Sequence, residues 1–385
     1  MYFFDRAFRA FFLGGSLFAA LSMLVWWLNY PLAITAFSGV DAMYWHAHEM
    51  VFGYALATIS GFLLTAVMNW TGLNSASGKA LASLFVLWFV ARVGFLINLP
   101  LAFIALLDIG FTLGLFLHFF IPIYKTKQWK QIGLSVKFLL LIVANGLFYA
   151  GALGFFQQGV YWGVIGGLFL VLAINLTMMR RLIPFFTEKA LGLPEKDNVK
   201  WIDGLAIGGF LALMCAAALA PNHWITSMVA FPLALIHFLR WYKWHHPKVW
   251  KIALLWPLYV SYAFMILGML LYGFVGLKML SESLAIHALA AGGIGLLCSS
   301  IMARISLGHT HRNVFEPPKW LVPVFFILTV TALVRVVLPM VDSAHYLLWM
   351  QLSQWGWISA FTLLSIIYWP ILTKPSPPKQ TGILL

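Results

Sequence analysis

Residues Tyr44–Trp70 read YWHAHEMVFGYALATISGFLLTAVMNW and decide the fold of this chain. After Glu49 the run is apolar for about twenty residues, the length that a helix needs to cross the ~30 Å hydrocarbon core of a bilayer. The imidazoles of His46 and His48 and the Glu49 carboxylate stand where such a helix leaves the headgroup region. Because each ionisable group at membrane depth costs roughly 2.5–3.5 kcal/mol on insertion scales, this triplet predicts a functional site.

The composition predicts a membrane protein with little mass outside the bilayer. The chain has 385 residues, of which 62% are hydrophobic and 9% are charged, whereas soluble domains carry about 25% charged residues. The formal net charge of +13 comes from Lys and Arg in short loops between apolar runs, which indicates membrane topology and argues against a nucleic-acid partner. Cys215 and Cys298 both lie in apolar spans, so a disulfide or an iron–sulfur cluster is not expected.

Apolar segments of membrane-spanning length recur about twelve times. Helices satisfy their own backbone groups in lipid, so we expect an all-α polytopic bundle of about 12 transmembrane helices in a single integral membrane domain, residues 1–385. A polar loop at 180–201 separates six spans within 10–179 from six within 202–371, a tail covers 372–385, and the halves show no convincing sequence repeat. The expected spans are 10–28, 45–69, 79–98, 101–121, 137–156, 159–179, 202–220, 224–243, 253–273, 284–304, 320–340 and 346–371.

The basic residues predict the orientation. Most of the 24 Lys and Arg residues lie in the N-terminal segment, in every second loop and in the tail. The intervening loops hold only Lys278, while Arg92 and Arg335 lie within spans. By the positive-inside rule, both termini are cytoplasmic.

This orientation places ionisable residues of several spans at one depth, near the outer surface. Neutral imidazoles ligate haem iron or copper, carboxylates fix the imidazole tautomer, and arginines pair with haem propionates. Small residues at 288–295 permit close approach by a neighbouring helix or by a flat macrocycle. The candidate residues at this depth are His46, His48, Glu49, Arg92, Asp108, His287 and Arg335.

Helix geometry limits how the first two histidines can act. His46 and His48 are two residues apart, about 200° around a helix, so if both are helical they point to opposite faces and do not share one metal. An alternative is that the candidate histidines are interhelical hydrogen-bond partners. Asp108 and Arg92 equally fit a structural ion pair, and the sequence leaves these alternatives open.

Basic motifs mark the cytoplasmic ends of two spans. Arg180 and Arg181 precede LIPFFT, which fits either a functional motif or a positive-inside anchor before a proline stop. Residues 304–312 read RISLGHTHR, in which an H-x-H pattern could chelate a metal, whereas the basic flanks favour anionic headgroups or haem propionates. The loop WHHP at 244–247 is expected to be interfacial.

Four motifs together resemble the NnrS family of bacterial inner-membrane proteins. They are WHAHEMxFGY followed by GFLLTAVxNWTG within Trp45–Gly72, RRLIPFFT at Arg180–Thr187, HALxxGxIG at His287–Gly295, and RxSLGHT at Arg304–Thr310. The motifs occur in the right order and cover most of the chain. The resemblance implies twelve helices, haem and copper, and protection from nitrosative stress during exposure to nitric oxide, usually linked to denitrification or nitric-oxide-responsive regulation.

Carried over by position, the resemblance marks His46, His48, Glu49, Asn69, Trp70, Arg180, Arg181, His287, Arg304 and His309. It does not say which histidine holds which metal, so the ligand roles rest on the predicted depth of the residues. His311 departs from the family pattern, which has a small residue there, and this argues against a conserved H-x-H copper site. The expected cofactors are haem of b type, since no c-type attachment motif is present, and copper. We expect metal ligation by His46, His48, His287 and His309, cofactor contacts from Arg92 and Arg335, and supporting roles for Glu49, Asn69, Trp70, Asp108, Arg180, Arg181 and Arg304.

Three hypotheses follow. The first is a haem protein that limits nitric oxide toxicity by binding or converting a small nitrogen oxide near the periplasmic side, with iron held by His48 and His287. The second is a haem–copper-type oxidoreductase that reduces nitric oxide or oxygen with quinol, although such enzymes need an H-H pair deep in a central helix. The third is a secondary transporter without a cofactor, for which ionisable groups at the midplane would be expected.

Overall fold

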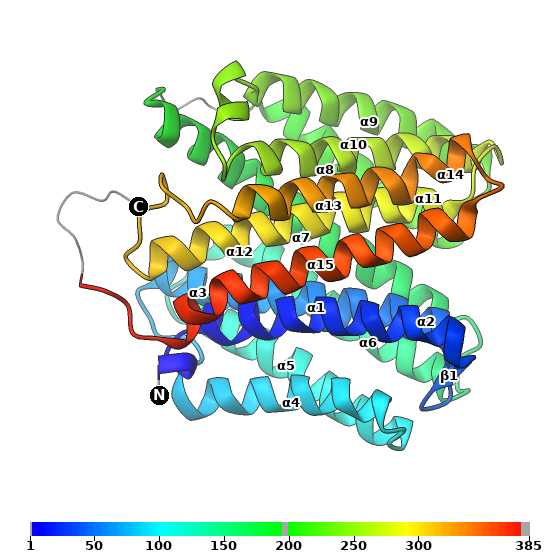
Figure 1. Cartoon of the computed structure of the whole chain (residues 1–385), viewed down its shortest axis with the longest axis horizontal. Coiled ribbons are helices and arrows are strands. Elements are labelled where there is room, and N and C mark those ends of the chain that lie inside the picture. The colour runs from blue at the N-terminus through cyan, green and yellow to red at the C-terminus, as the bar shows by residue number, and fades with distance from the viewer. Residues whose placement is uncertain (1, 195–198, 379–385) are drawn as a thin grey trace. The chain divides into compact units, whose positions relative to one another are not determined.

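The computed structural model describes residues 2–194 and 199–378, and nearly all of its regular structure is helical (Figure 1). Within these residues, 12 helices are long and apolar enough to cross a membrane. This confirms the predicted all-α polytopic bundle. Residues 195–198 of the predicted polar loop and 379–385 of the predicted tail, with Lys196 and Lys379, lie outside the described residues. The cytoplasmic location of both termini stays a prediction.

The chain forms two compact units. The first comprises Met1–Ile174, Met302–Arg312 and Phe361–Leu385, and the second comprises Asn175–Ile301 and Asn313–Ala360. The helices α7, α12 and α15 each have residues in both units.

In the first unit, α1 packs against α3, both α3 and α4 pack against α5, and α5 packs against α6. The elements that begin in this unit are the short 3-10 helices η1 (Tyr2–Phe4) and η3 (Trp129–Gln131), the strands β1 (Ala36–Phe37) and β2 (Val40–Asp41), α1 (Ala7–Leu32), α2 (Ala42–His48), the π-helix η2 (Glu49–Ala55), α3 (Leu56–Thr71), α4 (Gly78–Leu96), α5 (Leu101–Lys125), α6 (Ile132–Ala152) and α7 (Gly159–Leu191).

In the second unit, α9 packs against α8 and α10, and η5 packs against α10 and α13. The elements that begin in this unit are α8 (Lys200–Leu219), α9 (Trp224–Trp244), the 3-10 helix η4 (Pro247–Lys251), α10 (Trp256–Gly276), α11 (Glu282–His287), the π-helix η5 (Ala288–Gly295), α12 (Leu296–His309), α13 (Leu321–Val336), α14 (Leu338–Val341) and α15 (Tyr346–Thr373).

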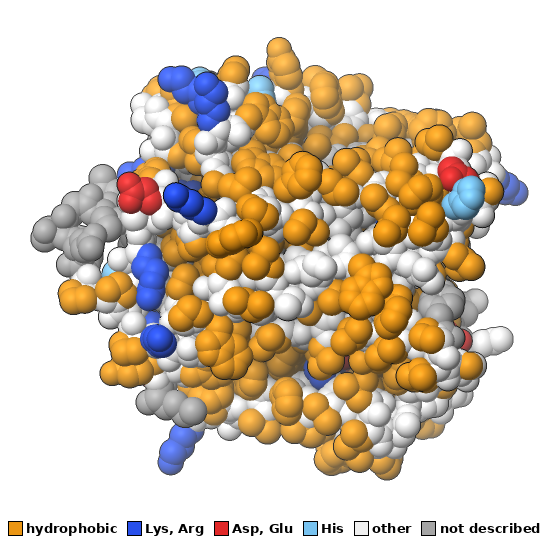
Figure 2. All heavy atoms as spheres, in the orientation of Figure 1, with side chains coloured by type: hydrophobic (Ala, Val, Ile, Leu, Met, Phe, Trp, Pro, Cys, Tyr) orange, Lys and Arg blue, Asp and Glu red, His pale blue; other side chains and the backbone are white. Residues whose placement is uncertain are grey.

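The surface has the character of a membrane-spanning protein. Large apolar side chains are exposed along single helices, for example Val86 and Phe89 on α4 and Leu106 on α5 at 70% exposure. Figure 2 shows hydrophobic side chains over most of the visible face, with most of the charged ones near helix ends. Exposed apolar area on this scale is unfavourable in water and matches a lipid environment.

A short hairpin leads the chain into the second span. β1 and β2 pair antiparallel, and the two turn residues Ser38 and Gly39 have φ of +48° and +83°, as tight two-residue hairpins require. The carboxylate of Asp41 then caps α2 by accepting a hydrogen bond at 2.8 Å from the backbone two residues on. The rings of Phe37 and Trp45 lie 4.1 Å apart. The hairpin therefore positions the start of α2. The predicted histidines lie in the last turn of this short helix.

Two spans contain a π-helical segment, and each segment follows directly on a histidine. His48 ends α2 immediately before η2, and His287 ends α11 immediately before η5. Gly53 and Gly292 each lie five residues after the histidine. A Cβ at either glycine would collide with a neighbouring aromatic ring, so both wide turns are closely packed. π-helical turns within α-helices are found frequently at functional sites.

The sixth span is longer than expected. The proline stop, one of the two interpretations of this motif, is not what the structure has, because α7 continues through Pro184 to Leu191. Proline removes only one backbone hydrogen bond, and Thr187 Oγ1 donates to the carbonyl oxygen of Ile183 at 2.8 Å in the same turn. The first part of the predicted loop at 180–201 is therefore helix.

Candidate functional site

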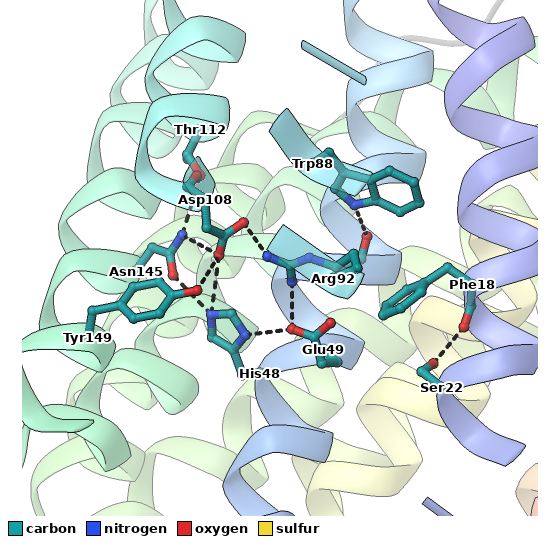
Figure 3. A network of polar contacts seen from close by, with 11 residues as sticks. Phe18, Ser22, His48, Glu49, Trp88, Arg92, Asp108, Thr112, Asn145 and Tyr149 are labelled. Carbon is teal, nitrogen blue, oxygen red and sulfur yellow. Dashed lines mark hydrogen bonds and ion pairs between the residues drawn. The ribbon is translucent and has the colours of Figure 1, made fainter. Parts of the chain in front are cut away.

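A cluster of polar side chains lies inside the first unit, within the membrane-spanning helices (Figure 3). Five elements from four spans contribute to it, and each of its side chains is at most 2% exposed. We call it the ion cluster. Its members are His48 of α2, Glu49 of η2, Arg92 of α4, Asp108 of α5, and Asn145 and Tyr149 of α6.

Arg92 joins two carboxylates from different helices. Its Nη1 donates to Glu49 Oε1 at 2.6 Å, and its Nη2 forms an ion pair with Asp108 Oδ1. Asp108 Oδ2 also accepts hydrogen bonds from Asn145 Nδ2 at 3.1 Å and from the Tyr149 hydroxyl at 3.0 Å. A buried charge is tolerated when it is paired, and each charge of the cluster has an ion-pair partner. Glu49 Oε2 and Arg92 Nε are buried without a hydrogen-bond partner among the described residues.

Both ring nitrogens of His48 face hydrogen-bond acceptors. Nδ1 lies 2.9 Å from Glu49 Oε1, the same oxygen that accepts from Arg92. Nε2 lies 3.0 Å from Asn145 Oδ1, because the amide nitrogen of Asn145 is turned toward Asp108. An imidazole donates from both nitrogens only when it carries two protons. The contacts therefore fit a protonated His48.

This protonation state also balances the charge of the cluster. The cations His48 and Arg92 then face the carboxylates Glu49 and Asp108, so the four charges sum to zero inside a volume closed to solvent. Neutral His48 would leave one net negative charge buried, which is costly in a medium of low dielectric constant. A balanced cluster of this kind holds four helices in register.

Aromatic rings enclose the His48 imidazole. The ring of Phe148 is stacked on it at 4.0 Å between centroids, and the ring of Phe52 lies at 4.9 Å. His48 is fully buried. In this arrangement both nitrogens lie within hydrogen-bond distance of oxygen atoms and aromatic rings pack against the imidazole. Ligation of a metal or haem by His48 stays a prediction.

His46 has different surroundings from His48. Both residues belong to α2, and the His46 imidazole stacks on the indole of Trp26 at 4.7 Å with 13° between the planes. His46 is partly exposed, whereas His48 is buried. The two side chains thus contact different neighbours, as the predicted 200° separation requires.

In the second unit, His287 and Arg335 lie against the same residue. His287 Nδ1 is 2.7 Å from the carbonyl oxygen of Ser283, one helical turn earlier. Arg335 Nη2 donates to Ser283 Oγ at 3.2 Å and to the Tyr346 hydroxyl at 3.4 Å. The Nδ1 contact requires an N–H there, which places the lone pair of the neutral ring on Nε2. Metal-ligating histidines are oriented in this way.

The small residues after His287 contact other side chains of the protein. A Cβ at Gly292 would collide with Phe264, one at Gly293 would lie 2.8 Å from Met265, and one at Gly295 would lie 2.7 Å from the Trp357 ring. The small face could admit either a neighbouring helix or a flat macrocycle, and side chains of neighbouring helices occupy it. A macrocycle would therefore have to approach His287 from another side.

The residues predicted to lie at cytoplasmic helix ends belong to different units of the structure. In the second unit, Arg180 pairs with Asp203 at 2.5 Å, and Arg181 beside it is half-buried. In the first unit, Arg304 is buried, and the His309 ring lies 5.6 Å from Phe8.

Several residues of these sites were not singled out from the sequence. Asn145 and Tyr149 complete the ion cluster, and their signal was a pair of polar residues four positions apart, on one face of an otherwise apolar helix. Asp203 at the start of α8 accepts from both Arg180 and Arg240. Here the signal was a carboxylate at a helix end facing basic motifs of other spans.

The side chains that could ligate a metal ion are those of His, Cys, Asp and Glu. Within 2–194 and 199–378, no group of three or more His, Cys, Asp or Glu side chains is arranged to hold a metal ion. Joint ligation of one iron by His48 and His287, and copper ligation by His46 or His309, stay predictions.

The fold and the ion cluster define a class: a multi-pass membrane protein that carries paired ionisable groups inside its spans. The family model described as NnrS protein matches residues 2–376, essentially the whole chain, and the chain belongs to the NnrS family. Membership supports a role in the nitric oxide stress response. A comparison with curated proteins gave no match.

Proposed function

We propose that this chain is a haem protein of the bacterial inner membrane that binds nitric oxide or a related small nitrogen oxide and thereby limits nitrosative stress. The family match supports the stress role, and the distribution of Lys and Arg supports insertion with both termini in the cytoplasm. The contacts among the described residues do not specifically favour the two alternatives, a quinol-dependent oxidoreductase and a secondary transporter.

The observation that carries the proposal is the orientation of His287. Its Nδ1 is held 2.7 Å from the Ser283 carbonyl oxygen, so Nε2 has the lone pair that iron requires. Arg335 contacts the same serine, and a guanidinium at this place is suited to pair with a haem propionate. Haem held by His287 would supply an iron atom able to bind nitric oxide.

His48 has a different task in this proposal. Its two ring nitrogens contact the Glu49 carboxylate and the Asn145 amide oxygen. In this proposal His48 therefore stabilises the packing of the helices, and it is not the iron ligand. Copper remains an expectation of the family resemblance and is not part of the proposal.

The test is an optical spectrum of the purified protein with and without nitric oxide, together with haem and metal analysis. We expect a Soret band that shifts on addition of nitric oxide. His287→Ala should lose most of the bound haem while remaining folded, and added imidazole should restore part of the band. His345→Ala is the matched control, because this histidine is exposed and lies in a turn of the same unit.

Two results would contradict the proposal. A wild-type protein that is folded but binds neither haem nor nitric oxide would overturn the function. A His287→Ala variant with an unchanged spectrum would overturn the ligand assignment alone.

A further inference from the structure

A cavity of about 260 Å³ lies in the second unit, between the end of α7, the start of α8 and the end of α9. It has no place in the proposed haem function. Its wall includes Thr187 and Glu188 of α7, Asp203 of α8, and Arg240, Lys243 and Trp244 of α9, with His245 and His246 directly after that helix. By the predicted orientation, it opens toward the cytoplasm.

The carboxylate in the wall is already neutralised. Asp203 Oδ2 pairs with Arg180 at 2.5 Å, and Asp203 Oδ1 pairs with Arg240 at 2.6 Å. One negative charge thus holds two guanidinium groups in place. The wall itself holds two cations, Arg240 and Lys243, and two carboxylates, Asp203 and Glu188. Arg180, which is not a wall residue, adds a third cation through Asp203, so the charges in and behind the wall sum to one positive charge.

Arg240 retains an unused donor in this arrangement. The residue is 5% exposed, and its Nη2 donates to Asp203 and to the Ile202 carbonyl oxygen. Its Nε is buried and has no hydrogen-bond partner among the described residues. A buried N–H without a partner costs about 1–3 kcal/mol, so the Arg240 guanidinium is not fully satisfied by the protein.

The two histidines of the wall also offer donors. His245 Nε2 accepts from the Trp250 indole N–H at 2.9 Å, and His246 Nδ1 accepts from the backbone N–H of Lys248 at 3.2 Å. Each ring uses its lone pair as an acceptor, so its other nitrogen carries the proton. Lys243 adds an ammonium group three residues from Arg240, on the same face of α9.

We propose that this cavity binds a small oxyanion. Guanidinium, ammonium and imidazole N–H groups converge on it from α9 and the loop that follows, and charge-assisted hydrogen bonds to oxyanions are the strongest that such donors form. The oxyanion is either free in the cytoplasm, as inorganic phosphate or nitrite, or is the phosphate of an anionic lipid headgroup in the inner leaflet. The shared chemistry is an anionic oxygen-bearing group of a few heavy atoms.

The experiment measures binding of inorganic phosphate and of nitrite to purified protein in nanodiscs of neutral lipid, by calorimetry. We expect saturable binding of one of them, weakened about tenfold in Lys243→Gln, since a hydrogen bond to a charged group contributes this much. Lys248→Gln is the matched control, because this exposed lysine of the same loop is not in the wall. Arg240→Gln is avoided, because it would remove one of the two cations that pair with the buried Asp203.

A second measurement separates the two sources. Protein extracted with phosphatidylglycerol is examined by native mass spectrometry. If the lipid headgroup is the ligand, wild-type protein retains anionic lipid and added phosphate displaces it. Lys243→Gln should not retain this lipid. The proposal is overturned if neither oxyanion binds and lipid retention is the same in wild type and Lys243→Gln. It is also overturned if Lys248→Gln weakens binding as much as Lys243→Gln does. Haem content is not involved, so this outcome is independent of the function proposed above.

Discussion

Two histidines of this protein end a short helix and are followed by a π-helical segment with a glycine five residues on, but their chemical surroundings differ. After His48 the next residue is Glu49, and an arginine from the following span, Arg92, bridges it to a second carboxylate. After His287 the next residue is Ala288, and the arginine of its following span contacts hydroxyl groups.

The comparison shows how one backbone feature serves two purposes. In the first region, a carboxylate and an amide oxygen face the two ring nitrogens of His48. In the second, a backbone carbonyl oxygen fixes one nitrogen and leaves the ring in the tautomer that metals bind. The first region therefore contributes mainly to stability, and the second is the better place for a ligand.

The largest expected effect is that of Arg92→Met. This change leaves Glu49 and Asp108 buried beside each other without their cation, and breaking a buried pair costs about 3–5 kcal/mol. Reversible unfolding in mixed micelles, followed by circular dichroism during an SDS titration, measures the loss. Arg335→Met is the matched change in the second region and should cost much less. Equal losses would contradict the division between the two regions.

Tyr149→Phe tests the closure of the ion cluster. It removes the hydroxyl that donates to Asp108 at 3.0 Å, and a hydrogen bond to a charged group contributes about 1.5–3 kcal/mol. Tyr346→Phe removes the 3.4 Å contact with Arg335 and should cost less than 1 kcal/mol on the same scale. The same SDS titration compares the two variants. A larger effect at Tyr346 would place the more tightly bonded cluster in the second unit.

Gly53→Ala tests the packing of the π-helical segment beside the ion cluster. The added Cβ would collide with the Phe18 ring and lie 3.3 Å from Arg92 Cδ, and overpacking of a buried site costs about 1–3 kcal/mol. Gly110→Ala is the control, because nothing lies within 4 Å of a Cβ there, and it should be neutral or slightly stabilising. If both variants had the wild-type midpoint, the close packing at Gly53 would be of no energetic importance.

The smallest expected effect is that of His46→Ala. It removes the stacking on Trp26, which contributes about 0.5–1.5 kcal/mol for an aromatic pair. His46→Phe should retain most of this stability, since a phenyl ring can keep the stacking on Trp26. A loss of bound metal in His46→Phe without a loss of stability would instead support the ligand role predicted from the sequence.

Membrane class, helix content and the positions of most spans followed from the sequence, because they depend on local composition. The predicted second span and its histidines lie where expected, and Gly72 ends α3 with a φ of +70°. The end of α7 was misplaced, since the sixth span was expected to end at 179 and a polar loop to begin at 180, whereas the helix continues to Leu191. The single hydrogen bond lost at Pro184 does not end a helix held by its neighbours.

The partners within the ion cluster did not follow from the sequence. Arg92 and Asp108 were recognised as a possible pair, but nothing within their own span showed which neighbours Asn145 and Tyr149 contact. Which helix faces meet depends on the packing of every span in the unit, and periodicity within one helix carries no information about its neighbour.

The sequence by itself determined that this chain spans a membrane, that ionisable groups enter its spans at costly positions, and that its motifs are those of the NnrS family. Only the tertiary structure decided which of those groups neutralise one another. Burial makes unpaired charge expensive, so the helices that supply opposite charges pack together, and His48 with Glu49, Arg92 and Asp108 forms a closed cluster. His287 is held by a backbone carbonyl oxygen instead, and that local difference makes it the candidate ligand.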